Sequence, residues 1–271
     1  MLALFRKPLL PYLYIIRIRL LASLAYRFEV FTRLGVNAVL LFATVFIWQA
    51  AYRGVDSAAG VNERQMTTYA ILAVLVQAVF SYNVQNTLRQ RIRRGEIATD
   101  FLKPVHLLGF WLSEDLGTAL SSLVMYLPPL LLVGAACFLL PLPASPAALI
   151  LFLPSVLLSY AILWLMSALV GMISFWAAEL GNMGVVKEAV VGALSGQLVP
   201  LWFFPDWMQQ ISRFLPFQYI YQVPLGIFIG RTGPEEAAAA MGVQAIWLAG
   251  FAALLALLWN RARRKLIVQG G

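Results

Sequence analysis

Residues 88–105 hold the densest group of side chains that could bind a charged partner. The stretch reads Leu-Arg-Gln-Arg-Ile-Arg-Arg-Gly-Glu-Ile-Ala-Thr-Asp-Phe-Leu-Lys-Pro-Val and contains five of the chain's 20 Lys and Arg residues: Arg89, Arg91, Arg93, Arg94 and Lys103. Clustered guanidinium groups attract acidic surfaces, which is binding chemistry and not catalysis. Four Arg within six positions could also be a simple topology anchor. A topology anchor needs only charge. The stretch also has apolar residues at roughly helical spacing, namely Ile97, Phe101 and Leu102, which favours an interaction element.

Catalytic patterns are missing from the rest of the sequence. There is no Gly-rich loop ending in Lys-Ser/Thr, so ATP hydrolysis by that route is not expected of this chain. One His and one Cys cannot form a metal cluster, and no Ser-centred nucleophile elbow occurs. His106 is interpreted as a polar residue at a helix end in preference to a proton relay, and Cys137 as a small packing residue. We expect no enzyme activity, metal or bound cofactor in the chain itself.

The segments on either side of the basic stretch have the composition of membrane spans. The chain is 61% hydrophobic and 12% charged, with a mean hydropathy of +0.80, which lies outside the soluble globular range. An all-α integral membrane protein follows, because only helices of about 20 apolar residues satisfy the backbone across a bilayer. We predict six spans over 35–52, 67–86, 117–140, 147–177, 184–204 and 243–259.

The distribution of basic residues predicts the orientation of these spans. Sixteen of the 20 Lys and Arg fall on one side of the six-span layout when Lys187 is assigned to that side. The positive-inside rule then puts both termini in the cytoplasm, as in a multi-pass protein of a bacterial inner membrane. The high pI of about 9.9 is explained by topology, so no nucleic-acid partner is expected.

Two further segments have their own character. Residues 1–34 form a cytoplasmic N-terminal segment with an amphipathic helix beginning after Pro11, suited to the headgroup layer; a basic flank before the first span is the alternative. Residues 200–231 are too apolar for a solvated loop and too rich in Pro for one helix, so short external re-entrant helices are predicted there. Their expected markers are Pro200, Pro205, Trp207, Pro216 and Pro224. A basic tail, 260–271, ends the chain after the transmembrane domain of 35–259.

Polar residues inside the spans are few. Gln77, Ser81 and Asn83 in the second span, and Gln197 with the Gly192–Gly196 pair in the fifth, are candidates for a translocation path or a subunit seam. Ordinary helix–helix hydrogen bonding and packing explain them equally well. Glu179, Lys187 and Glu188 are interpreted as charges at the membrane boundary. The scarcity of buried charge argues against an ion-coupled transporter.

The stretch Arg-Arg-Gly-Glu-Ile-Ala-Thr-Asp-Phe-Leu-Lys-Pro-Val resembles the block of ABC-type exporter permeases that begins with Gly-Glu and ends with Pro. More narrowly, the chain is similar to the branch of type-2 ABC exporter permeases with about 260–270 residues. Leu-Ala-Tyr-Arg-Phe-Glu at 24–29, Met-Thr-Thr-Tyr at 66–69 and the Pro-bounded segment 200–224 agree with this likeness. Lys103 stands where Arg is expected in many relatives, a departure that keeps the charge.

The resemblance implies specific roles. The loop 88–105 would be a coupling helix that docks on an ATP-binding subunit, through Gly95, Glu96, Ile97, Phe101, Leu102 and Pro104, flanked by Arg93 and Arg94. The chain would be half of an exporter, working with two ATPase subunits, which hold ATP and Mg, and with a second permease that is a distinct homologue or a second copy. Membrane lipids surround it. The cargo would be an amphipathic or hydrophobic compound such as a drug, antibiotic, lipid or glycolipid.

Two other hypotheses stay open at this point. The chain could be a secondary transporter or channel, which the scarcity of buried charge disfavours. It could also be a membrane scaffold that recruits a cytoplasmic partner through the basic loop without transporting anything. A nucleotide-dependent partner at the loop would separate the exporter from both.

Overall fold

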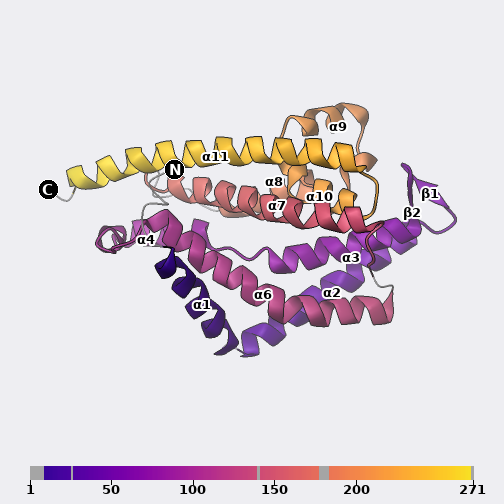
Figure 1. Cartoon of the computed structure of the whole chain (residues 1–271), viewed down its shortest axis with the longest axis horizontal. Helices are drawn as coiled ribbons and strands as arrows, with labels where there is room; N and C mark the ends of the chain where they lie inside the picture. The colour runs from indigo at the N-terminus through magenta and orange to yellow at the C-terminus, as the bar shows by residue number, and fades with distance from the viewer. Residues whose placement is uncertain (1–8, 26, 139–140, 177–182, 270–271) are drawn as a thin grey trace.

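The computed structural model describes residues 9–25, 27–138, 141–176 and 183–269. In these residues, five helical segments are long and apolar enough to cross a membrane: Phe28–Ala51, Glu63–Arg93, Leu107–Cys137, Pro146–Ile173 and Pro234–Arg263. They lie side by side in one elongated bundle (Figure 1). The prediction of an all-α membrane protein is therefore confirmed, whereas a sixth long helix is not found in the described part of the chain.

Four long helices each begin before the span predicted for them, and the last of them also ends after it. Helix α2 covers Arg27–Ala51, α6 covers Leu107–Cys137, α7 covers Pro146–Ile173 and α11 covers Pro234–Gln269. Helix α7 begins with Ser145 as its N-cap, whose side chain accepts the backbone N–H of Ala148 at 3.1 Å, satisfying one of the free donors of the first turn. The predicted third span began at 117 and so omitted residues 107–116 of α6, which contain Ser113, Glu114 and Asp115.

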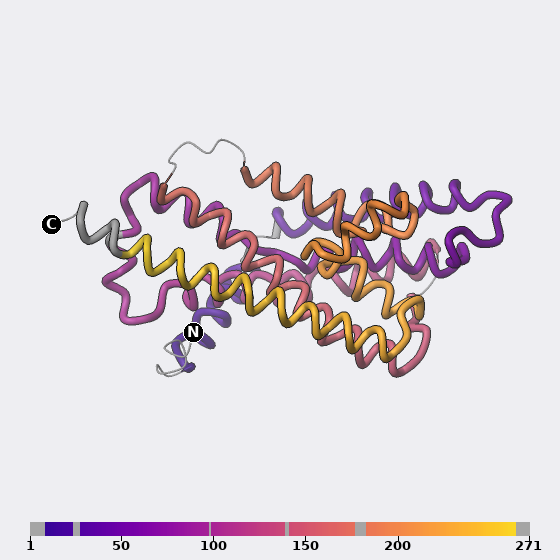
Figure 2. Tube along the Cα trace, turned by 90° about the horizontal axis from the view of Figure 1, so that it is seen from above, coloured from indigo at the N-terminus to yellow at the C-terminus, as the bar shows by residue number. Residues whose placement is uncertain are grey.

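The two ends of the bundle differ (Figures 1 and 2). The loop end carries α4 (Val84–Arg93), α5 (Ile97–Asp100) and the C-terminal part of α11. The hairpin end carries the two-residue strands β1 (Ser57–Ala58) and β2 (Val61–Asn62). Burial raises the pKa of the Tyr52 hydroxyl, which stays protonated and donates to the carbonyl of Val61 at 3.1 Å.

The N-terminal helix α1 covers Leu10–Ala25 and packs across the first half of α6. At their crossing, a Cβ on Gly117 would lie 2.7 Å from the Cβ of Arg19, so only glycine permits this approach. Arg19 also forms an ion pair with Glu114 on α6. Phe28 and Phe31 belong to α2, so the predicted N-terminal segment 1–34 contains the start of that helix as well as α1.

The second predicted span is interrupted. Helix α3 covers Glu63–Val79, four residues without helical structure follow at 80–83, and α4 then continues to Arg93. Asn62 begins α3 with a capping box, in which its side chain and that of Gln65 each accept a backbone N–H of the other. The interruption divides the bundle into a main apolar core around α3 and a smaller one at the loop end around Leu88, Trp111 and Met172.

The fifth predicted span, 184–204, is not one long helix. Helix α8 covers only Met183–Leu194, about 18 Å at 1.5 Å per residue, which is short of a hydrocarbon core of about 30 Å. Gly196 then takes a φ of +83°, which ends helical geometry. Because α7 ends at the loop end and α11 begins at the hairpin end (Figure 2), the chain returns between them through α8 and a series of shorter elements.

Residues 200–231 form four short helices: η2 (Leu201–Phe203), α9 (Asp206–Arg213), η3 (Phe217–Tyr219) and α10 (Gln222–Phe228). Pro205 precedes the start of α9 and Pro216 follows its end, as predicted. Pro200 precedes η2, Trp207 is exposed and Pro224 lies buried inside α10. The fully buried Gln244 of α11 joins this region to α7, because its Nε2 donates to the carbonyl of Tyr219 at 2.8 Å and its Oε1 accepts from Ser155 at 3.1 Å. That the four short helices enter the membrane as external re-entrant helices stays a prediction.

Candidate functional site

The loop after α4 is held to the bundle by one buried carboxylate. Asp100, 1% exposed, accepts both hydrogen bonds from Nη1 of Arg91, at 2.8 and 2.9 Å, and forms a 2.8 Å ion pair with Lys103. Gly95, with a φ of +72°, provides the turn that brings α5 back against α4. The basic stretch is therefore folded on itself, with two of its cations facing inward.

The predicted docking residues divide into two groups. Ile97 is buried in the apolar core of the loop end, and Phe101 is half-buried. The other six are exposed, with Leu102 at 84%; they are Arg93, Arg94, Gly95, Glu96, Leu102 and Pro104. Arg94 and Glu96 lie 3.8 Å apart. Ile97 and Phe101 therefore anchor the loop, and Leu102 stands out as an apolar group surrounded by charge.

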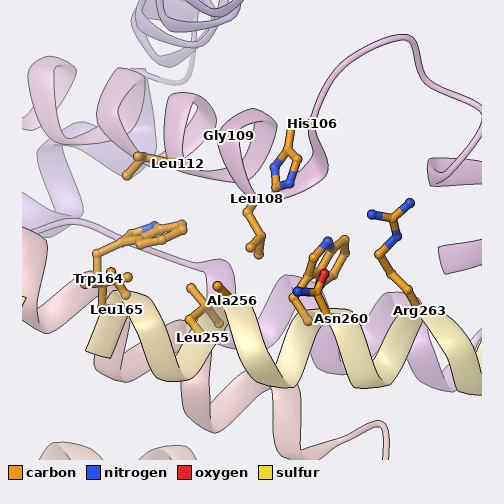
Figure 3. Close-up of a pocket in the computed structure, with 12 residues that line it drawn as sticks. His106, Leu108, Gly109, Leu112, Trp164, Leu165, Leu255, Ala256, Asn260 and Arg263 are labelled. Carbon is orange, nitrogen blue, oxygen red and sulfur yellow. The ribbon is translucent and has the colours of Figure 1, made fainter. Parts of the chain in front are cut away.

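Phe101 connects the loop to α11. Its ring stacks on Trp259, with ring centroids 5.6 Å apart, and the guanidinium of Arg263 lies 5.9 Å from its centroid. Beside this contact, a largely apolar groove of about 340 Å³ separates α6 from α11. Figure 3 shows Leu108 and Leu112 facing Leu255 and Ala256 across it, with His106 and Arg263 at the loop side. The loop's anchor thus lies next to a gap in the packing, where the two helices can shift with less loss of contact than in a filled core.

The interruption of the second span is stabilised by a buried carboxylate from another helix. Asp115 on α6 accepts the backbone N–H groups of Asn83 and Val84, at 2.9 and 3.0 Å, and the indole N–H of Trp164 on α7 at 2.9 Å. The first N–H groups of a helix lack partners within it, and a negative charge at that end also complements the helix dipole. Asp115 therefore acts as a cap for α4 and fixes where α4 begins.

A polar cavity of about 390 Å³ opens beside this interruption. Its polar and aromatic walls come from α2, α3, α6, α8 and the segments around residues 81 and 197; they include Arg33, Asn37, Gln77, Ser81, Tyr82, Tyr126, Glu188, Gln197 and Tyr221. Three of the candidate path residues, Gln77, Ser81 and Gln197, are thus brought to one space. Most of these groups are neutral hydrogen-bonding groups, and Arg33 is ion-paired with Glu29 at 2.8 Å.

Lys187 and Glu188 form a charged network at the edge of this cavity. The Lys187 ammonium, on a residue 7% exposed, lies 2.7 Å from Glu188 Oε1 and donates to Ser167 Oγ at 2.7 Å. Tyr82 donates its hydroxyl to Glu188 at 2.7 Å and its ring lies 4.5 Å from the ammonium. Lys187 is buried between α7, α8 and the interruption, and its interpretation as a charge at the membrane boundary stays a prediction. Glu179 lies outside the described residues.

The other candidate path residues lie elsewhere. Asn83 stands at the start of α4, and its side-chain oxygen accepts from Asn86 at 3.2 Å. Gly192 is in α8, but Gly196 lies beyond the helix end, so the two do not share one helical face. The carbonyl of Gly196 accepts the hydroxyl of Tyr69 at 2.7 Å. A Cβ there would meet that hydroxyl at 2.9 Å, which explains the glycine.

Sequence reasoning missed Asp100 as the loop's anchor and Asp115 as the cap. Asp115 precedes the predicted third span, and no role was predicted for it. Asn83, a typical N-cap residue inside an apolar run, was the one signal that a helix begins there. Among the described residues no group of three or more His, Cys, Asp or Glu could hold a metal ion. What the arrangement can do is bind a partner at the loop end and transmit its movement to the cavity.

Comparison with known proteins gives one match, to a protein family. The family model described as ABC-2 family transporter protein matches residues 38–270, which is most of the chain. A search of curated proteins gives no match, and a search of solved structures gives none either.

Proposed function

Because the chain belongs to the ABC-2 family of transporter proteins, and is thus a membrane permease that associates with an ABC ATP-binding subunit, we propose that it forms the translocation path of an ATP-driven exporter. The observation that carries this proposal is a continuous set of contacts from the exposed loop to the polar cavity. The loop is tied to α4 through Asp100, α4 begins at the cap made by Asp115, and the residues just before α4 line the cavity.

The proposed mechanism follows from this connection. An ATP-binding subunit docks on Glu96, Leu102 and the arginines beside them. ATP-driven closure of two such subunits pushes the loop, and α4 moves with it because the Asp100 bonds are buried and strong. Ser81 and Tyr82, directly before α4, then shift in the cavity wall. The nucleotide changes transport only if closure favours one permease conformation over the other.

The proposed assembly has two permeases and two ATP-binding subunits. ATP and Mg are held by the ATP-binding subunits, and hydrolysis takes place there. The second permease is a distinct homologue or a second copy of this chain. We place the protein in a bacterial inner membrane with six crossings, in which α8 and the short helices after it make the fifth. Both termini and the loop end are then cytoplasmic, consistent with the surplus of basic residues on that side.

The cargo is proposed to be an amphipathic or hydrophobic compound with a polar portion, such as a drug, antibiotic, lipid or glycolipid. The cavity supports this through its mixture of amide, hydroxyl and aromatic groups, which suits a ligand with both polar and apolar surfaces. Its formal charges are compensated within the described residues, because Arg33 pairs with Glu29 and Lys187 with Glu188.

A secondary transporter is the second candidate, and the buried Asp115 and Lys187 favour it more than the sequence did. Both oxygens of Asp115 are, however, occupied as a helix cap, and Lys187 is paired with Glu188. These bonds give both groups a structural task that needs no transported proton. The exporter accounts for the exposed loop as well, which ion-coupled transport leaves unexplained.

The test is reconstitution of the complex with its ATP-binding subunit in proteoliposomes. Leu102→Ala and Glu96→Ala should lower subunit binding and transport-coupled ATP hydrolysis at least fivefold, because both side chains are exposed on the loop. Glu235→Ala, an exposed glutamate of the hairpin end, is the matched control and should keep full activity. Full coupled activity in both loop variants, or transport driven by an ion gradient without nucleotide, would refute the proposal.

A further inference from the structure

A second polar cavity, of about 230 Å³, lies among the short helices between α8 and α11. Its walls include Trp202 of η2, Gln209 and Arg213 of α9, Gln222 of α10, and Arg231. It shares no lining residue with the cavity beside α4 or with the groove at the loop end. The proposed coupling of the loop after α4 to the translocation path does not use this second cavity, so the composition of the cavity needs a separate explanation.

The charge of this cavity is positive and uncompensated. Arg213 and Arg231 both line it, and no Asp or Glu does. In the described part of the chain, neither guanidinium has a carboxylate within 4.0 Å. Arg231 uses one N–H on the carbonyl of Ala59, at 2.6 Å, and lies over the ring of Trp202 at 4.6 Å. These contacts hold the guanidinium in place without neutralising it.

The cavity also has a surplus of hydrogen-bond donors. Trp202 is 8% exposed, and its indole Nε1 is buried with no acceptor among the described residues. Gln222 accepts the backbone N–H of Leu201 at 2.7 Å through its Oε1, so its amide nitrogen is left to donate. A buried donor without an acceptor is costly and uncommon in native proteins. Two cations and the Gln222 amide favour a ligand that supplies negative charge and several acceptor oxygens, whereas the Trp202 indole Nε1 has no surface open to the cavity.

The size and the surroundings of the cavity restrict the class of ligand that it can bind. The cavity is smaller than most sites for drug-sized molecules, so it accommodates a small anionic group and not a whole lipid. Helix α9, which forms one wall, exposes Trp207 and Ile211 at 63% and 52%, and Phe214, directly after the helix, is 81% exposed. Such an apolar, partly aromatic face suits the boundary between lipid tails and headgroups. The adjacent cavity would then lie at the depth of lipid phosphates.

We propose that this cavity binds a phosphate group, presented by a phospholipid headgroup or by free phosphate. Arginine forks match phosphate oxygens in pairs, and the tetrahedral anion can accept from Arg213, Arg231 and an N–H of the neighbouring wall at once. The proposal is independent of ATP-driven export. It assigns to the short helices a ligand-binding role in addition to closing the bundle.

The test uses the full-length chain purified in an uncharged detergent. Inorganic phosphate and water-soluble dihexanoyl phosphatidylglycerol are titrated separately by calorimetry, with dihexanoylglycerol as the phosphate-free control. Arg213→Gln should weaken binding at least tenfold, because a hydrogen-bonded charge is removed. Arg53→Gln, an exposed arginine of the hairpin end outside the cavity, is the matched control and should bind as wild type does.

Binding of inorganic phosphate alone would identify free phosphate as the source, and binding of the phospholipid alone would identify the headgroup; both support the site. No binding of either, equal affinity in Arg213→Gln and wild type, equal loss in Arg53→Gln, or equal binding of dihexanoylglycerol would overturn it. Arg213 is exposed, so its substitution is not expected to impair folding, and the melting temperature of each variant checks this.

Discussion

Removing the Asp115 carboxylate should both destabilise the protein and uncouple the loop from the cavity. Asp115→Ala leaves three donors without their acceptor: the backbone N–H of the exposed Asn83, and the backbone N–H of Val84 and the indole N–H of Trp164, which belong to buried residues. Hydrogen bonds inside membranes average about 0.6 kcal/mol, and a typical bond in water-soluble proteins is worth up to about 1.5 kcal/mol. Three such bonds predict a loss of about 2–4 kcal/mol in the free energy of unfolding.

Asp115→Asn separates the cap from the volume of the side chain. The amide keeps one acceptor oxygen, which can serve Val84 and Trp164, but its nitrogen faces the N–H of Asn83. We therefore expect a smaller loss, about 1–2 kcal/mol. Trp164→Phe removes one donor, and in a double-mutant cycle with Asp115→Ala the two changes should be non-additive, because both remove the same hydrogen bond.

The assay is equilibrium unfolding in mixed micelles, followed by tryptophan fluorescence, together with transport-coupled ATP hydrolysis in proteoliposomes. Coupled hydrolysis should fall in Asp115→Asn even where the protein stays folded, since α4 would no longer begin at a fixed residue. Asp56→Asn, an exposed aspartate near the hairpin, is the matched control. A loss of stability below about 0.5 kcal/mol in Asp115→Ala, within the range of an ordinary surface substitution, would show that the cap reasoning is wrong.

Three further predictions concern the loop, the cavity and the orientation. Asp100→Asn should release Arg91 and Lys103 and lower the affinity for the ATP-binding subunit several-fold in a pull-down; unchanged affinity would mean that the loop needs no anchor. Tyr82→Phe removes the hydroxyl that donates to Glu188 and should change cargo-stimulated ATP hydrolysis more than basal hydrolysis, and equal effects on both would argue against a role in the path. Single cysteines at residues 57–62 should react with a membrane-impermeant maleimide in intact cells; labelling that requires permeabilisation would reverse the proposed orientation.

The class of the protein was predictable from composition and one motif. Runs of apolar residues determine membrane helices because the bilayer demands about 20 such residues and internal backbone bonding. The prediction missed helix ends: residues 107–116 were omitted from the third span because Ser113, Glu114 and Asp115 interrupt an otherwise apolar stretch, yet α6 packs against α1 and α4. It also missed that the fifth span has only 12 helical residues in α8, because hydropathy does not report the turn at Gly196.

The candidate site, like the fold, could be predicted from the sequence only in part. The amino-acid sequence by itself determined that residues 88–105 form a basic stretch between apolar segments, because charge and turn-forming residues are local properties. Only the tertiary structure decided which of these residues face inward, since the partner of Arg91 is nine positions away and that of Phe101 is Trp259, on the last helix. It likewise assigned Asp115 to the start of α4, a contact across 31 residues that no local pattern encodes. A carboxylate's role depends on which donors surround it, and those donors come together only when the helices pack.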